Sequence, residues 1–447
     1  MRTLKKSFNP LTPFQEFFKT ESSSGIVLLA VTLLALLLAN SPAANNYFSF
    51  FEAHLTVGFP GLTIDKPLLL WINDGLMAVF FLLIGLEIKR ELRYGELSDL
   101  RSALLPLVAA AGGAIVPGLI FFFFNAGTDF ADGWAIAIAT DIAFAIGILT
   151  LLGSGVPLWA KVFLTAVAVV DDLIAIMVIA IFYTSGIKMT ALIVAAACVV
   201  ILLIMNRLDV RRLGFYILVG IILWVAVLKS GVHATIAGVI LGLSIPATRK
   251  RSLNSILKQA ESAVSLFKDA IRHEQDEDRE TALNFMDDVV TQSESPLHRL
   301  EHQLHPWVAY GIIPIFAFAN AGLAINGNLI AAAFSSTLTW GIILGLFAGK
   351  QIGIFLSVYL MKILGLSTFP NKKGTLKMVY GLACLSGVGF TMSLFIAGLS
   401  FDSAAYLEYS KIGIIIGSLL SGLLGYALIR SALKDLKPVA QYSEAPS

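Results

Sequence analysis

Two adjacent aspartates, Asp171 and Asp172, lie in the middle of an apolar run at 161–183 that is long enough to span a bilayer. One ionisable group at such a depth costs at least ~2.5–3.5 kcal/mol, so two neighbouring carboxylates need a compensating role. Adjacent helical side chains point roughly 100° apart, so both reach a protein interior only where helices converge. We interpret the pair as an ion or proton site; the alternative is a pair of satisfied core acids.

Further polar side chains interrupt other apolar runs at a similar depth: Asn73 and Asp74, Thr140 and Asp141, Lys350, and Thr391 and Ser393 after a Ser-Gly-Val-Gly break. Carboxylate and hydroxyl oxygens suit alkali cations and protons and not soft metals. Together these residues predict a polar cavity at the centre of a helical bundle. The alternative is a scatter of separate structural pairs.

The elements that must position these groups are membrane-spanning helices. Of the 447 residues 57% are hydrophobic and only 14% are charged, and the mean hydropathy is +0.81. Such values indicate an all-α polytopic membrane protein with about twelve transmembrane helices. We place them at 24–40, 67–89, 103–124, 134–152, 157–183, 190–206, 213–228, 231–245, 306–325, 339–363, 376–400 and 409–430.

The basic residues predict the orientation, because cytoplasmic loops are rich in Lys and Arg. With both termini in the cytoplasm, the outside segments hold only Lys66, Lys188, Lys229 and Lys411. The inside segments then hold Arg2, Lys5, Lys6, Lys89, Arg90, Arg93, Arg101, Arg207, Arg211, Arg212, Arg249, Lys250, Arg251, Lys372, Lys373, Lys377, Arg430, Lys434 and Lys437.

Two segments outside the spans stand out. Two β-prone stretches around a Phe-Pro-Gly turn at about 55–66 predict an extracytoplasmic β-hairpin, which packs on another surface, such as a second copy of itself. At 247–305, apolar residues at helical spacing and the acidic run 273–280 predict a cytoplasmic amphipathic insertion. That insertion is either a solvated linker or a regulatory element. The predicted organisation is spans at 1–246, the insertion at 247–305, spans at 306–434 and a cytoplasmic tail at 435–447.

The spans at 134–152 and 376–400 are predicted to be discontinuous. The Gly-rich break in the later span would expose backbone carbonyls and helix ends, which is tolerated at membrane depth only where they line a cavity. Spans three to five and ten to twelve form triplets of opposite orientation, which is typical of inverted repeats.

Several classes of protein are disfavoured. Cys198 and Cys384 lie in apolar runs and suggest no disulfide or metal framework, and no phosphate loop or nucleic-acid patch is present. An intramembrane aspartyl protease needs its two acids on separate helices, in YD and GxGD contexts, whereas here they are adjacent. A passive channel is usually built from symmetric rings of carbonyls or charges, and a mid-membrane lysine beside acids suits a carrier better. We therefore predict a transporter that is no enzyme and needs no cofactor.

Long stretches of the chain resemble the NhaA-type sodium/proton antiporters. The matching segments cover most of the chain: 68–92, 133–149, VVDDLIAI at 169–176, 216–240, 305–322 and GVGFTMSLFIA at 387–397. The insertion at 250–299 departs from the family pattern. Inverted repeats are a described property of this family, so the repeat interpretation is not independent of the resemblance.

The resemblance implies a role for each matching residue. Asp172 resembles the principal ligand of the transported Na⁺, and Asp171 resembles its neighbour, which pairs with Lys350. Thr140 and Asp141 match the crossing of two broken spans, where Asp141 balances helix-end charges. Asp74 resembles a deep carboxylate in the cytoplasmic funnel. Glu87, Glu91, His233, Glu301, His302 and His305 fall at positions that the family uses for pH sensing, although a lone His233 among small residues is also typical of a hydrogen-bonded packing residue.

The implied function is electrogenic, pH-regulated export of Na⁺ and Li⁺ in exchange for H⁺, for sodium and cytoplasmic pH homeostasis. The implied setting is the lipid bilayer of the bacterial inner membrane, as a homodimer, with no nucleic-acid partner.

Overall fold

The computed structural model describes residues 13–436 except 60–61, 154, 185, 249–252, 273–279, 282, 287–288, 290–293, 367–368 and 370–373. Within that part, nine helices are long and apolar enough to cross a membrane, or ten if a pair bent by 109° at residues 40–43 is one span. The chain is therefore a multi-pass helical membrane protein, as predicted.

The chain divides into two compact units. Unit 1 comprises Met1–Met77, Glu96–Thr184 and Ala309–Ser447, and unit 2 comprises Ala78–Gly95 and Ser185–Val308. The elements of unit 1 are α1 (Pro13–Ala39), α2 (Ala44–Glu52), β1 (His54–Phe59), β2 (Leu62–Pro67), α3 (Leu68–Trp71), η1 (Ile72–Leu76), η2 (Glu96–Ser98), α5 (Leu100–Asn125), η3 (Ala131–Ile138), α6 (Ile142–Leu151), α7 (Leu158–Phe182), α14 (Ile313–Asn320), α15 (Gly327–Ser335), α16 (Thr337–Leu344), η5 (Gly345–Gly349), α17 (Lys350–Ile363), α18 (Thr375–Leu385), α19 (Phe390–Ser400) and α20 (Ala404–Leu436).

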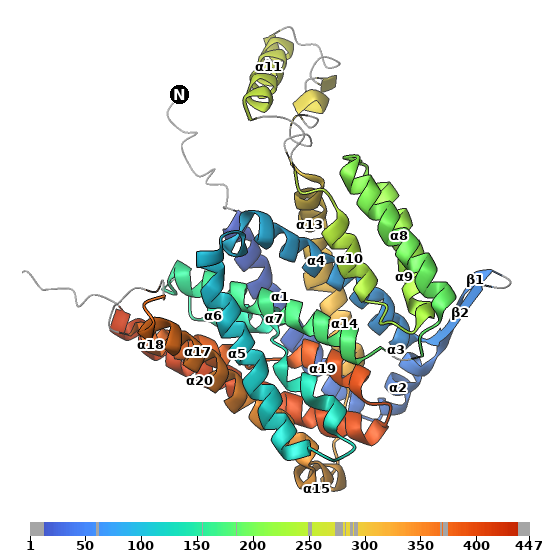
Figure 1. Ribbon diagram of the computed structural model, residues 1–447, viewed down its shortest axis with the longest axis vertical. Helices are drawn as coiled ribbons and strands as arrows, with labels where there is room; N and C mark the ends of the chain where they lie inside the picture. Colours follow the sequence, from blue (N-terminus) through green and yellow to red (C-terminus); the bar gives the residue numbers. More distant parts are fainter. Residues whose placement is uncertain are drawn as a thin grey trace, which may run out of the picture. The chain divides into compact units, whose positions relative to one another are not determined.

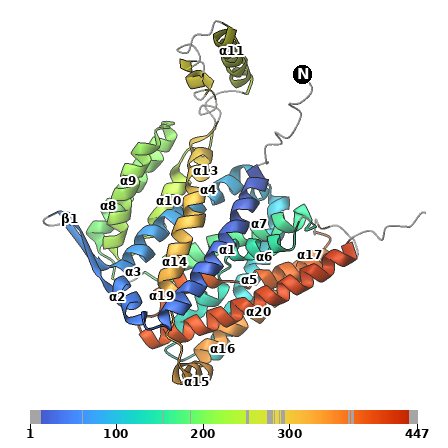
Figure 2. The same ribbon diagram turned by 180° about the vertical axis from the view of Figure 1, so that it is seen from behind.

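In unit 1, α17 packs along α5, α18 packs along α20, and α1 lies beside both α6 and α14 (Figures 1 and 2). Small residues allow the α5–α17 contact, because a Cβ on Gly353 would stand 2.1 Å from the carbonyl oxygen of Gly112. An apolar core drawn from α5, α6, α7, α17, α18 and α20 includes the fully buried Leu149, Val167 and Leu382. The polar groups described below are therefore set in a closely packed scaffold.

Two stretches of unit 1 lose helical structure between apolar helices. Residues 139–141 separate the 3₁₀ segment η3 from α6, and residues 386–389 separate α18 from α19. Both interruptions fall within otherwise continuous apolar segments, Ala131–Leu151 and Thr375–Ser400.

The predicted β-hairpin is present as the antiparallel pair β1–β2, with Val57 opposite Ile64 and Thr56 opposite Asp65. Thr56 donates a hydrogen bond of 2.8 Å to the Asp65 carboxylate, and with His54 it holds the pKa of Asp65 below its usual value. The predicted turn, at 60–61, lies outside the described residues. The sequence interpretation did not include the helix α2 that precedes the hairpin.

Unit 2 contains α4 (Met77–Tyr94, from Ala78 onward), α8 (Met189–Arg207), α9 (Leu213–Ser230), α10 (Ile236–Ser244), α11 (Leu253–Arg272) and α13 (Pro296–Trp307), which leads into the π-helical turn η4 (Val308–Ile312). The core of this unit includes Leu86, Leu202, Tyr216 and Leu223. Helix α11 coincides with the predicted amphipathic stretch. Most of the predicted acidic run and the tail from 437 lie outside the described residues.

The twelve predicted spans all fall on observed helices. Nine correspond to the long apolar helices, and the remaining three correspond to α1, the short α10 and the α13–η4–α14 run. Length and composition therefore support nine or ten spans among the described residues, and the count of twelve stays a prediction.

Candidate functional site

The centre of the site is the carboxylate of Asp171 on α7. Its Oδ2 atom accepts hydrogen bonds from Lys350 Nζ and from Thr140 Oγ1, each at 2.6 Å. The side chains of Asp171 and Lys350 are both 0% exposed. Its other oxygen, Oδ1, is buried and accepts no hydrogen bond from the described residues. One carboxylate oxygen is thus occupied by a lysine, and the other has unused coordination capacity.

Each partner of Asp171 comes from a different part of unit 1. Lys350 is the first residue of α17 and directly follows the π-helical turn η5. Pro117 of α5 lies so close that a Cβ on Gly349 would stand 2.7 Å from the Pro117 Cα. Thr140 lies in the extended stretch between η3 and α6, and its hydroxyl also contacts the Ser386 carbonyl at 2.7 Å. The two interrupted segments therefore meet at Thr140, which contacts Asp171.

Asp172 follows Asp171 on α7 and is only 3% exposed. The two adjacent acids are chemically unequal, because Lys350 directly compensates the charge of Asp171 and not that of Asp172. Carboxylate oxygens are ligands that alkali cations accept. The pair can therefore hold a monovalent cation or protons.

Asp141 holds the crossing of the interrupted segments together. It is the N-cap of α6, where its Oδ1 accepts from Phe144 N at 3.0 Å. Its Oδ2 accepts from Thr391 N of α19 at 2.9 Å and also from the Thr391 hydroxyl. Helix N-termini carry partial positive charge, so one carboxylate compensates two of them at once.

The crossing requires a very close backbone approach. Asp141 N donates to Val388 O at 2.6 Å, and Ser393 Oγ donates to Ile136 O at 2.8 Å. A Cβ on Gly389 would stand 2.8 Å from the Ala139 carbonyl oxygen. Only glycine fits at this position without a shift of the opposite backbone.

Asp74 does not join the other predicted site residues. It lies in the π-helical turn η1, and its Oδ2 accepts from Lys66 Nζ of β2 at 2.7 Å. Its neighbour Asn73 exchanges hydrogen bonds with Asn320 of α14, at 2.9 and 3.3 Å. The hairpin lysine reaches Asp74 because the residue follows the hairpin closely in the chain. The assignment of Asp74 to a cytoplasmic funnel stays a prediction.

The six predicted pH-sensing residues all belong to unit 2. Arg90 of α4 forms ion pairs with Glu301 and, at 3.0 Å, with Glu91, and Glu87 is partly buried one turn earlier. His305 is partly buried, and His302 is exposed. His233 lies elsewhere, in the turn before α10, where Nδ1 is 2.9 Å from the Thr235 hydroxyl. His233 therefore has a hydrogen-bond partner, and its role in pH sensing stays a prediction.

Glu301 and the charged residues around it, Glu87, Arg90, Glu91 and His298, are called the Glu301 cluster below. The sequence interpretation did not assign two of its members to the site. One is Arg90, and the other is His298, whose Nδ1 lies 3.6 Å from Glu301 Oε2. The i,i+3 spacing of His298 and Glu301 on a helix was an available signal. No such local signal predicts the pairing of Arg90 with Glu301, which lies 211 positions away in the sequence.

Among the described residues, no group of three or more His, Cys, Asp or Glu side chains could hold a resident metal ion. The site instead contains two adjacent carboxylates, a lysine and a hydroxyl at the centre of a membrane-spanning unit. Cations and protons would compete there for the same oxygens. A fold and a site of this kind define a multi-pass ion carrier.

Sequence comparisons give the particular family. The profile of the family described as Na⁺/H⁺ antiporter 1 matches residues 15–429. A Na⁺/H⁺ antiporter NhaA of Oleidesulfovibrio alaskensis is 46% identical over 432 residues, which cover 96% of each chain. The relative of the same name from Rhodospirillum rubrum is 47% identical over 95% of this chain and 99% of its own. The chain belongs to the NhaA-type Na⁺/H⁺ antiporter family, which confirms the resemblance.

A solved structure of a sodium proton antiporter from Methanocaldococcus jannaschii covers 95% of this chain and 98% of its own, with a TM-score of 0.48 and 15% identity.

Proposed function

We propose that this chain exports Na⁺, and also Li⁺, in exchange for H⁺ across the bacterial inner membrane. The observation that carries the proposal is the buried group of Asp171, Lys350 and Thr140 beside the buried Asp172. The relatives named above are Na⁺/H⁺ antiporters and match nearly the whole chain.

The cycle rests on competition at one site. When the cavity faces the cytoplasm at alkaline pH, Asp172 loses its proton and binds the cation. The cation also draws on Asp171, whose pairing with Lys350 then breaks. The cation and the protons exclude each other at this site. In the proposed cycle only the cation-loaded or the protonated carrier changes its facing direction, and these two conditions together couple the two fluxes.

Exchange of this kind is electrogenic if more protons than cations move in each cycle. A unit charge that crosses 100 mV gains ~2.3 kcal/mol, so the membrane potential would help to drive export. Lys350 is the group that supports this version, because it provides a second site from which a proton can leave.

The finer architecture belongs to the same proposal. It has about twelve spans with both termini in the cytoplasm, inverted repeats, and two discontinuous spans that cross at Asp141.

The β-hairpin supports a homodimer, since an isolated two-stranded hairpin is marginal in water and exposes unpaired strand edges. The cluster of Glu87, Arg90, Glu91, His298 and Glu301, together with His302, His305 and His233, supports regulation by cytoplasmic pH.

Asp172→Asn tests the site assignment, because it removes the ionisable carboxyl but keeps the shape of the side chain. In everted vesicles that carry a pH-sensitive dye, we expect no Na⁺-dependent proton release above that of vesicles without the protein. The matched control is Asp129→Asn, which alters an exposed carboxylate and leaves exchange unchanged. Substantial residual exchange in Asp172→Asn, at equal amounts of protein, overturns the assignment.

A further inference from the structure

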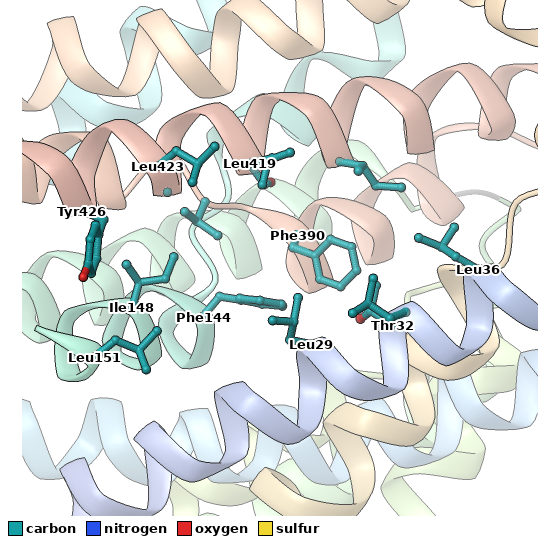
Figure 3. A pocket seen from close by; sticks show the side chains of 15 residues that line it. Leu29, Thr32, Leu36, Phe144, Ile148, Leu151, Phe390, Leu419, Leu423 and Tyr426 are labelled. Atoms are coloured by element: carbon teal, nitrogen blue, oxygen red, sulfur yellow. The ribbon is translucent and has the colours of Figure 1, made fainter.

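A wholly apolar pocket of about 400 Å³ lies in unit 1 between α1, α6 and α20, and its inner end reaches the α18–α19 interruption (Figure 3). Leu29 of α1, Phe144 and Ile148 of α6, Phe390 of α19 and Leu419 and Leu423 of α20 are among the residues that line it. Its volume lies within the range of small-molecule sites, which is roughly 300–1,000 Å³.

Two of the three hydroxyl-bearing side chains in this lining, Thr32 and Ser418, use their hydroxyls in hydrogen bonds within the protein, and the third, Tyr426, lies at one end. The Thr32 hydroxyl donates to Leu28 O at 2.7 Å, and the Ser418 hydroxyl accepts from Gly389 N at 3.3 Å. No charged residue lines the pocket. The occupant must therefore be a hydrocarbon and not a polar solute.

The pocket opens toward the bilayer. Leu33, Leu419 and Leu423 are 52%, 59% and 61% exposed in this membrane-spanning chain, so their outer surfaces meet lipid. Hydrocarbon is as apolar as leucine, so apolarity alone gives no preference for one lipid over another. A resident lipid needs a polar contact in addition.

Arg430 provides such a contact. On α20, Leu419, Leu423, Tyr426 and Arg430 follow one another at spacings of four, three and four residues, which places them on one face. The Tyr426 hydroxyl lies at the end of the pocket (Figure 3), and the exposed Arg430 follows one turn further along the helix. Among the described residues, Arg430 forms no ion pair and no side-chain hydrogen bond, and it lies six residues before the end of α20. A basic residue near the end of a span attracts anionic lipid headgroups.

We infer that this pocket is a binding site for one anionic phospholipid, with an acyl chain between α1, α6 and α20 and the phosphate on Arg430. The chain would contact Val388 and Phe390, the residues on either side of Gly389 at the crossing. The bound lipid would thus support the α18–α19 interruption through these two side chains. The inference does not depend on the exchange of any particular ion.

The test is native mass spectrometry of the delipidated protein titrated with phosphatidylglycerol or phosphatidylcholine. We expect phosphatidylglycerol to bind wild type about fivefold more tightly, the factor given by ~1 kcal/mol per arginine at a membrane surface. Arg430→Gln should remove this preference. Lys362→Gln, which alters an exposed basic residue in the last turn of α17, should retain it.

A steric variant tests the position of the acyl chain. Leu419→Trp fills the pocket from a lipid-facing position and should weaken the binding of both lipids. Leu420→Trp alters the neighbouring residue of α20, which is 41% exposed and does not line the pocket, and should bind as wild type. Equal binding by Leu419→Trp and Leu420→Trp overturns the site, and equal binding of the two lipids by wild type overturns the headgroup contact. Because the readout is bound mass, a failure of Na⁺/H⁺ exchange would leave this test intact.

Discussion

At the scale of single residues, the defining feature is an ion pair with no access to solvent. Lys350 and Asp171 compensate each other in a medium where an isolated charge is very costly. Breaking such a pair leaves an uncompensated charge, whereas removing both charges together is often neutral or stabilising. The pair is therefore a poor device for stability, but it suits a carrier in which an arriving cation must displace the lysine.

Substitution of both partners distinguishes these effects. Lys350→Met should destabilise the protein by ~3–5 kcal/mol, because it leaves the Asp171 charge without its partner. The double variant Lys350→Met, Asp171→Asn should recover most of that loss. Thermal unfolding of the purified protein in one detergent provides the measurement. A double variant no more stable than Lys350→Met would contradict the pairing.

Thr140 supplies a second hydrogen bond to the same carboxylate oxygen. Thr140→Val keeps the shape of the side chain but removes its donor to Asp171. A lost hydrogen bond to a charged group costs ~1.5–3 kcal/mol, so we expect a lower unfolding temperature and a weaker apparent affinity for Na⁺ in vesicle exchange. Thr128→Val is the control, because the Thr128 hydroxyl bonds only to the last residue of α5 and to Phe130 in the turn that follows; it should keep the Na⁺ affinity of wild type.

At the scale of elements, the crossing of the two interrupted segments sets the site. Asp141 joins the start of α6 to the start of α19, and Thr140, one residue earlier, joins the same place to α7. A shift of either segment therefore moves ligands of the other. The local cost of unpaired helix ends is offset by one carboxylate that accepts from both.

Two glycines provide a matched test of this crossing: Gly389, which directly precedes α19, and Gly398, which lies within α19. Gly389→Ala should clash with the Ala139 carbonyl and cost ~1–3 kcal/mol, with a loss of Na⁺-dependent exchange. Gly398→Ala lies in the same segment with open space around the new Cβ, and should be neutral or stabilising by ~0.5–1 kcal/mol. Unfolding temperature and vesicle exchange measured together would separate the two outcomes. Equal behaviour of the two variants would contradict a tight crossing.

At the scale of the whole molecule, the ion site and the acid–histidine cluster belong to different compact units. In the proposed function, cargo binding and pH sensing therefore belong to separate units, each with its own apolar core. Glu301 is the centre of the second cluster, because both Arg90 and His298 contact its carboxylate.

Glu301→Gln should therefore alter regulation and not cargo binding. We expect the pH profile of exchange to shift, while the maximal rate and the apparent Na⁺ affinity stay within about twofold of wild type. Vesicle exchange measured from pH 6.5 to 9 would show both quantities. The exposed Glu96→Gln is the control. A changed Na⁺ affinity with an unchanged pH profile would count against the regulatory assignment.

The insertion offers a broader test, because no residue of α11 belongs to the apolar core of unit 2. Deletion of 253–293 with a short Gly-Ser linker should leave the maximal exchange rate within about twofold of wild type. Exchange in everted vesicles, normalised to protein amount, provides the measurement. Complete loss of exchange by correctly inserted protein would show that the insertion takes part in transport.

Local pattern was sufficient for much of this protein. The lengths of the apolar runs predicted where helices lie, the two β-prone stretches predicted β1 and β2, and mid-span charges singled out Asp171, Asp172, Asp141 and Lys350. Hydropathy and periodicity are properties of neighbouring residues, so they can be read along the chain. The motifs around these residues also sufficed to identify the family.

Only the tertiary structure decided which groups meet. Asp141 accepts from a helix 250 positions away, Lys350 reaches an acid 179 positions away, and Asp74 pairs with the nearby hairpin instead of joining them. Each of these pairings depends on how packed helices bring distant segments together, and periodicity carries no such information. The residue types that make an ion site were therefore evident from the sequence. The packing of the bundle decided which partners Asp171, Asp141 and Asp74 each have.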